Sequence, residues 1–298
     1  MKSLFKALIG AGLCIALFSI TSCKKDNSEQ AAAVNEEEAA VISQENAEAE
    51  AEYDDAAEIG MAAGADLEVA LQSANNTGSV NLGARLELFA DLYFKIGPCV
   101  TITVSPNDTT FPKTITIDYG SGCICRDGKL RKGAIILHYT APLRRPGAVL
   151  TITFRDYFVN RKHIEGVKTI TNLSADGAVK YSVQVQNGKI SWPNGRGFTY
   201  AGIKTVTQVQ GMDTRTVRDD VYTIEGRSET TYANGITVVK NTETPLVKPV
   251  ACHWIVQGVL KIKINNAAFY IDFGAGDCDN KALLTNVQLN KTIEITLP

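Results

Sequence analysis

From Cys99 to the C-terminus, apolar and polar side chains alternate along one short segment after another. β-branched and aromatic residues dominate these segments, and Gly, Asn, Asp and Pro separate them. The clearest examples cover residues 100–104, 114–119, 134–139, 149–154, 180–186, 259–264 and 268–273. A period of two places successive side chains on opposite faces of a β-strand. The pattern predicts a β-rich domain, and no stretch after residue 96 has the period of a helix longer than two turns.

Turn-forming sequences lie between these segments and indicate that consecutive strands run antiparallel. Asn187-Gly188 and Asn234-Gly235 are typical of two-residue hairpins, because both central residues of such a turn adopt positive φ. About 200 residues are enough to bury a core as one domain. We therefore expect an all-β fold, mainly an antiparallel meander, that forms either a sandwich or a partly open barrel. The sequence does not distinguish between a sandwich and a partly open barrel.

Two phrases repeat the same unusual order of residues: IDYGSGCICRDG at 117–128 and IDFGAGDCDN at 271–280. In the second copy, a strand turns at Asn265-Asn266 and returns. Paired residues of an antiparallel hairpin keep a constant sum of residue numbers. The residue numbers of Cys252 and Cys278 add up to one less than those of the turn residues Asn265 and Asn266. We predict that they form a disulfide across the open end of the hairpin, with a one-residue slip at Gly274 or Gly276.

The first copy repeats this layout more loosely. Cys99 precedes a strand at 100–104, and the returning strand leads through Gly120-Ser121-Gly122 to Cys123. We predict a Cys99–Cys123 disulfide and two related hairpins, at about 99–125 and 252–280. Each bridge closes a loop of about 25 residues and is expected to stabilise the fold by roughly 3 kcal/mol. The role of Cys125 stays open, and Cys123-x-Cys125 lacks the usual spacing of a zinc site, so we predict no metal.

Asp118 and Asp272 occupy matching places just before a glycine in the two phrases. Such carboxylates are candidate calcium ligands or catalytic acids. An aspartate in this position also bonds the backbone N–H groups of the turn that follows. We favour the second interpretation.

The N-terminus predicts export and lipidation. Lys2 and Lys6 precede a short apolar run, and Thr21-Ser22-Cys23 then resembles a bacterial lipobox, whose cysteine receives a diacylglycerol. We assign residues 1–22 to a signal peptide and expect acyl chains on Cys23 to anchor the protein in a membrane. Residues 24–29 resemble the charged export tags of surface lipoproteins in Bacteroidetes-type bacteria. The expected location is the outer membrane, on the cell surface, where disulfides are permitted.

Residues 23–84 are rich in Ala and Glu, with 14 acids and no base between Asp26 and Glu68. Because this segment has few large apolar residues, we expect a disordered or partly helical acidic tether that forms no core. The β-rich domain would then occupy residues 85–298, with the amphipathic piece at 85–95 as its first packed element.

The domain itself is basic, above all between Arg126 and Lys168. A polyanion such as an acidic glycan is one candidate partner for this stretch. The candidate contacts are Arg126, Lys129, Arg131, Lys132, Arg144 and Arg145. The same side chains would equally suit a solvated face, or would bind the acidic tether. Nucleic acid is not expected as a partner of an exported protein.

The two repeated phrases, the stretch that continues to residue 172, and NGKISWPNG at 187–195 resemble a family of Bacteroidetes-type lipoproteins without an established activity. The resemblance covers most of residues 97–290. It implies an envelope location and contributes no catalytic residues. In such organisms Asp108-Thr109-Thr110 resembles an O-glycosylation signal, with Thr109 as the acceptor.

No catalytic or cofactor motif occurs in the chain. Only three histidines are present, and two Ile-Glu-Gly phrases, around Glu165 and Glu225, suggest a recurrent structure at strand ends. We therefore expect a non-enzymatic binding or structural module that recognises a glycan, a polyanion or an envelope protein. The alternatives are a polysaccharide hydrolase with unidentified carboxylates, and a carrier of lipid or lipoprotein.

Overall fold

The computed structural model describes residues 36–77, 92, 96–213 and 219–297 of the 298-residue chain. The predicted signal peptide, the acylation site Cys23 and the export tag lie outside these ranges. Of the predicted element at 85–95, only Leu92 is described. It is buried, and its backbone N–H donates to Asp66 Oδ2 at 2.9 Å.

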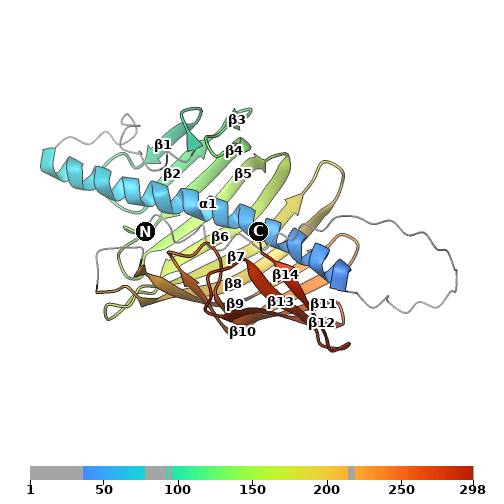
Figure 1. Cartoon of the computed structure of the whole chain (residues 1–298). Coiled ribbons are helices and arrows are strands. Elements are labelled where there is room, and N and C mark those ends of the chain that lie inside the picture. The colour runs from blue at the N-terminus through green and yellow to red at the C-terminus, as the bar shows by residue number, and fades with distance from the viewer. Residues whose placement is uncertain (1–35, 78–91, 93–95, 214–218, 298) are drawn as a thin grey trace.

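One antiparallel sheet of 14 strands makes up most of the fold (Figure 1). Each strand pairs with the next along the chain, except that β2 pairs with β4 and the short β3 joins β4 from the side. The strands are β1 (Thr101–Ser105), β2 (Lys113–Asp118), β3 (Cys123–Ile124), β4 (Leu130–Tyr139), β5 (Val149–Val159), β6 (Lys162–Asn172), β7 (Lys180–Ser191), β8 (Gly197–Gln210), β9 (Val221–Tyr232), β10 (Thr237–Pro249), β11 (Gln257–Ile264), β12 (Ala267–Ala275), β13 (Lys281–Asn286) and β14 (Lys291–Thr296).

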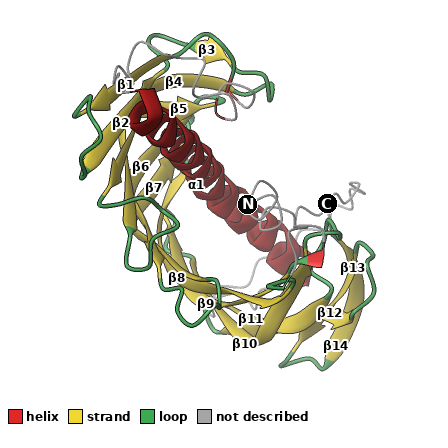
Figure 2. Ribbon diagram, turned by 90° about the vertical axis from the view of Figure 1, so that its left-hand side faces the viewer, coloured by secondary structure: helices red, strands yellow, loops and turns green. Residues whose placement is uncertain are grey.

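The predicted all-β meander is confirmed, and the sheet is an open one. Figure 2 shows it curled into a C, with β1 and β14 as its two edges. Of the two predicted closures, the partly open barrel therefore describes this molecule, and the sandwich does not. All seven segments predicted as strands lie on strands of this sheet.

The helix α1 (Glu36–Thr77) lies along the concave face of the sheet (Figure 2). Its buried side chains include Tyr53, Ile59 and Leu67, which join a core formed with β1, β2 and β4–β8. The expectation that the acidic segment forms no core is therefore wrong. Small residues let the helix approach closely: a Cβ on Gly60 would lie 2.9 Å from Leu150 Cδ2, and one on Gly64 would lie 2.7 Å from Leu143 Cδ1.

A row of irregular positions crosses the sheet from β4 to β12, and we call this row the crease. On most of these strands a residue with positive φ marks it: Gly133, Asp156, Gly166, Asn187, Gly258 and Gly274. The strand registers shift at the same places, except between β8 and β9, and the pairing of β10 with β9 is broken between Asn241 and Leu246. Because a bulge bends and twists its strand, a row of bulges bends many strands at one level.

Two predictions about residues of the crease are wrong. Asn187-Gly188 is not a hairpin turn but a bulge inside β7, and the Ile-Glu-Gly phrases lie inside β6 and β9 and not at strand ends. Gly166 and Gly188 leave no room for a side chain, because neighbouring strands and α1 pack closely against them. A Cβ on Gly166 would lie 2.7 Å from Gly188 Cα, and one on Gly188 would lie 2.8 Å from the Tyr53 hydroxyl.

Both predicted disulfides are present, Cys99–Cys123 and Cys252–Cys278, each with a Cα–Cα distance of 5.8 Å. The β11–β12 hairpin has the predicted register, with Ile262 opposite Phe269. The register of this hairpin shifts by one residue where Gly258 of β11 faces Phe273 and Gly274 of β12. Gly274 is one of the two positions predicted for this shift. The two aspartates cap their turns: Gly120 N–H donates to Asp118 Oδ1 at 2.8 Å, and Gly274 N–H donates to Asp272 Oδ1 at 2.9 Å. The interpretation as turn caps is confirmed.

Candidate functional site

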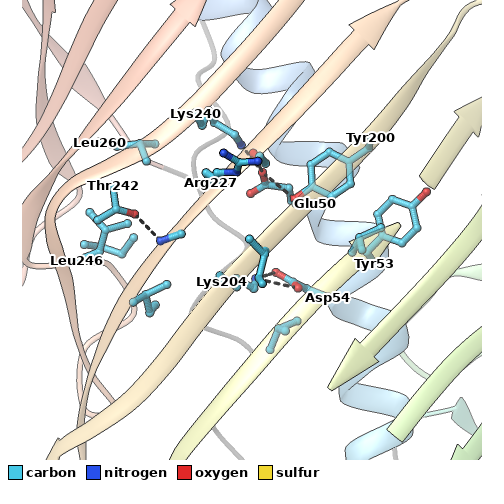
Figure 3. A pocket seen from close by; sticks show the side chains of 18 of the residues that line it. Glu50, Tyr53, Asp54, Tyr200, Lys204, Arg227, Lys240, Thr242, Leu246 and Leu260 are labelled. Carbon is cyan, nitrogen blue, oxygen red and sulfur yellow. Dashed lines mark hydrogen bonds and ion pairs between the residues drawn. The ribbon is translucent and has the colours of Figure 1, made fainter. Parts of the chain in front are cut away.

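A network of ion pairs fixes α1 to the sheet at the crease. Asp54 carries the most buried of them: Lys168 Nζ lies 2.5 Å from its Oδ1, and Lys204 Nζ lies 3.0 Å from each of its oxygens. One turn earlier, Glu50 pairs with Lys240 and accepts a hydrogen bond from the Tyr200 hydroxyl at 3.1 Å (Figure 3). These residues come from β6, β8 and β10, so α1 ties together strands that are not neighbours.

A second group of ion pairs lies on the other side of the same helical turn. Arg131 Nη2 lies 2.6 Å from both Asp55 Oδ2 and Asp127 Oδ2, and the Arg131 side chain is fully buried. Glu52 pairs with Lys162 at 2.6 Å and with Lys129 at 3.6 Å. Since Glu52 and Asp55 face β4–β6 while Glu50 and Asp54 face β6–β10, acidic side chains hold the helix from both sides.

The two carboxylates nearest β8 and β10 stay ionised. Burial by itself would raise the pKa of Asp54, but Lys168 and Lys204 outweigh it, and the pKa is lowered. Burial would also raise the pKa of Glu50, but the attraction of Lys240 and Lys204 is stronger, so this pKa is lowered as well. For Lys168, burial dominates over the attraction of Asp54 and lowers the pKa to about 8.

A cavity of about 160 Å³ opens beside these charges, between α1 and the sheet (Figure 3). At its polar end lie Glu50, Asp54, Lys168, Lys204 and Lys240. Its remaining wall is mainly apolar and includes Val183, Val185, Ile224, Leu246, Leu260, Phe273 and Leu297. Polar members of this wall are Arg227, Ser228 and Thr242. For comparison, an apolar cavity of about 150 Å³ in an engineered protein holds benzene. The cavity is therefore large enough for one apolar group of that size, with a charged group beside it.

The rim of this cavity is a loop that two constraints hold in place. His253, Trp254 and Ile255 line the cavity from this loop. Lys248, only 4% exposed, donates to the backbone oxygen of Cys252 and to that of Trp254, the latter at 3.4 Å. The Cys252–Cys278 disulfide fastens the start of the loop to the segment between β12 and β13. Burial lowers the pKa of Lys248 to about 8. The rim is thus part of the fixed scaffold, which reduces the ordering cost of binding.

The basic side chains predicted as a polyanion site do not form one patch. Arg131, Lys129 and Arg144 bind carboxylates of α1, so for these three the structure shows the alternative in which the basic stretch binds the acidic segment. Arg126 and Lys132 lie exposed near the start of β4, whereas Arg144 and Arg145 lie in the loop after its other end.

The other predicted site residues are accounted for as follows. Thr109 is exposed in the loop after β1, where Lys113 Nζ donates to the backbone oxygens of Pro106 and Asp108. Cys125 is buried with its sulfur 3.9 Å from Cys123 Sγ, and burial raises the pKa of its thiol. Asp118 and Asp272 are separated by eight intervening strands of the sheet order, so they form no joint site.

Comparison with protein-family models, with curated proteins and with solved structures returned no match. The site is therefore defined by its own geometry. Within the described residues, no group of three or more His, Cys, Asp and Glu side chains is arranged to hold a metal ion. In the same part of the chain, no helix has both the length and the apolar character that a membrane span requires.

Sequence reasoning missed the cavity and its charged end. A signal was present: Lys168, Lys204 and Lys240 each lie within a strand, and Glu50 and Asp54 are spaced by one helical turn, which places them on one face of a helix. Only the folded structure shows which lysine meets which carboxylate, because the lysines lie on three strands and more than a hundred residues from Glu50 and Asp54 in the sequence.

Proposed function

We propose that this chain is a non-enzymatic binding protein of the bacterial envelope, anchored to the outer membrane by acyl chains on Cys23 and exposed at the cell surface. The observation that carries the binding proposal is the cavity between α1 and β7–β12, with its apolar wall and its charged end. The lipobox, the export tag and the two disulfides support the envelope location.

The geometry favours a small ligand over a large lipid cargo. A carrier of lipid or lipoprotein would need a long apolar groove on the concave face of the sheet. In this protein α1 occupies that face, and its Tyr53, Ile59 and Leu67 are at most 1% exposed. The remaining cavity has room for a single apolar group, which supports selective binding of one molecule.

The hydrolase alternative receives little support from the same residues. A glycosidase needs a carboxylic acid that stays protonated near neutral pH and a second carboxylate that is ionised. Both carboxylates of the cavity, Glu50 and Asp54, have a lowered pKa because they face lysines. Neither is therefore suited to donate a proton to a leaving group.

Calorimetric titration with a neutral apolar probe tests the binding proposal. We expect 1-octanol to bind the purified chain in detergent-free buffer with one site per chain. Leu260→Trp, which fills the cavity from β11, should abolish this binding, whereas Leu283→Trp on the exposed side of β13 should leave it unchanged. If neither 1-octanol nor its carboxylate analogue octanoate binds, or if 1-octanol binds Leu260→Trp as well as the unaltered chain, the cavity is not a binding site.

A further inference from the structure

The polar end of the cavity carries more positive than negative charge. The ammonium groups of Lys168, Lys204 and Lys240 face the carboxylates of Glu50 and Asp54. Arg227 also lines the cavity, so its positive charges outnumber its negative ones. A charge in such a partly buried place is costly unless a counter-charge lies near it. The site therefore favours a negatively charged group on a ligand.

Two of the three lysines are accessible enough to meet a ligand. The side chain of Lys168 is 1% exposed and bonds both Asp54 and the backbone oxygen of Tyr53, at 3.0 Å. In contrast, the side chains of Lys204 and Lys240 are 21% and 12% exposed. An ammonium group has three N–H donors. Lys204 directs its contacts to Asp54 and Lys240 directs its contact to Glu50, so each retains donor capacity for an anionic group.

Apolar residues line the side of the cavity opposite Lys204. In Figure 3, Leu246 and Leu260 are on the far side of the space from Lys204 and Asp54. A ligand that fills this space must therefore present an apolar group at one end and a polar group at the other. The volume of about 160 Å³ accommodates an apolar part of about six to eight carbon atoms, judged from the benzene-sized cavity of similar volume.

We propose that the cavity binds an anionic amphiphile, with an alkyl, acyl or aryl group against Leu246, Leu260 and Phe273 and a carboxylate or phosphodiester beside Lys204 and Lys240. This inference rests on the proposed function, since it requires that the cavity admit an apolar group. A cationic amphiphile would add like charge to the excess, and an uncharged sugar would leave the apolar wall without a matching surface.

Four probes that share one chain length test the charge requirement. Octanoate and octyl methyl phosphate are monoanions that represent the two possible head groups, 1-octanol is neutral, and octylammonium is a cation. Titrated into the purified chain by calorimetry, at least one of the two monoanions should bind about tenfold or more tightly than 1-octanol, and octylammonium should bind more weakly than 1-octanol. The better monoanion identifies the head group.

Variants locate the anion. Lys240→Gln and Lys204→Gln each remove a charge and keep most of the side-chain length, and each should weaken octanoate binding about tenfold while 1-octanol binding stays the same. Lys261→Gln is the matched control, because Lys261 lies on β11, is 39% exposed and pairs with Glu243 away from the cavity. It should bind all four probes as the unaltered chain does.

The outcomes separate the two proposals. If none of the four probes binds, the proposed function fails. If 1-octanol binds as tightly as both monoanions, or if octylammonium binds best, the cavity is a binding site and the inference about charge is overturned. Should a glutamine variant fail to fold, as judged by circular dichroism, the ranking of the four probes on the unaltered chain decides alone.

Discussion

Asp54 is predicted to be exposed to solvent from its sequence context, but in the structure it is buried. It belongs to a run of acids and alanines whose composition is typical of an extended tether. In the fold it is 1% exposed and bonded by two lysines from different strands. No local pattern separates this acid from the exposed Glu38 on the same helix, because its partners come from β6 and β8. Its burial is therefore a property of the tertiary structure.

Removing the Asp54 charge should destabilise the fold strongly. In Asp54→Asn, Lys168 and Lys204 lose their carboxylate inside the protein, and we expect the free energy of unfolding to fall by about 3–5 kcal/mol. Denaturation with urea measures this change. Glu45→Gln on the same helix is the control, because the Glu45–Arg196 pair is more exposed and should contribute less than about 1 kcal/mol. Equal effects of the two substitutions would contradict the buried network.

The lowered pKa values of Glu50 and Asp54 set the direction of the pH dependence. A carboxylate whose pKa is lower in the folded state than in the unfolded state stabilises the fold above its unfolded pKa, and this contribution is lost as the pH falls through the folded pKa. We expect the free energy of unfolding to decrease below about pH 4. The double variant Glu50→Gln/Asp54→Asn, if it folds, should show a shallower decrease between pH 4 and pH 2. If the free energy of unfolding of the double variant falls as steeply between pH 4 and pH 2 as that of the unaltered chain, Glu50 and Asp54 do not cause the loss of stability in acid.

At the scale of elements, the strands were predictable and the helix packing was not. Alternation is a local signal, and it located seven strands, the β11–β12 register and both disulfides. The remaining strands include β8 and β9, whose alternation is interrupted by glycines at the crease. A glycine inside a strand resembles a turn when only neighbouring residues are considered, which is why Asn187-Gly188 was mistaken for a hairpin. The contact of α1 with the sheet depends on alanines and glycines, which carry little signal in a hydrophobicity pattern.

The contact between the crease and the helix makes Gly188 a sensitive position. A Cβ there would lie 2.6 Å from the backbone oxygen of Tyr200 and 2.8 Å from the Tyr53 hydroxyl. We expect Gly188→Ala to lower the free energy of unfolding by about 2 kcal/mol or more, because the clash involves backbone. Gly177→Ala offers a comparison: its φ is +81° but no atom lies within 4 Å, so only backbone strain of about 1 kcal/mol is expected. Thermal denaturation of the two variants should rank them in this order, and the reverse order would contradict the close packing of β8 and α1 against Gly188.

For the whole molecule, a curled sheet encloses a helix, and a small cavity lies beside that helix. The sheet has two open edges, so closure through strand pairing does not hold its curvature. The ion pairs of α1 with β4, β6, β8 and β10, together with the buried face around Tyr53 and Ile59, connect the two arms of the C. The cavity and its charged end exist only because the helix is there, since Glu50 and Asp54 form part of its lining.

Hydrogen exchange followed by mass spectrometry tests most directly whether the acidic segment is an interior element. If α1 is seated in the sheet, amides between residues 50 and 71 should exchange as slowly as those of β5–β8, and Asp54→Asn should accelerate exchange in this segment first. If residues 50–71 exchange within seconds while the sheet stays protected, the segment is a solvated tether and the cavity argued from its contacts does not form.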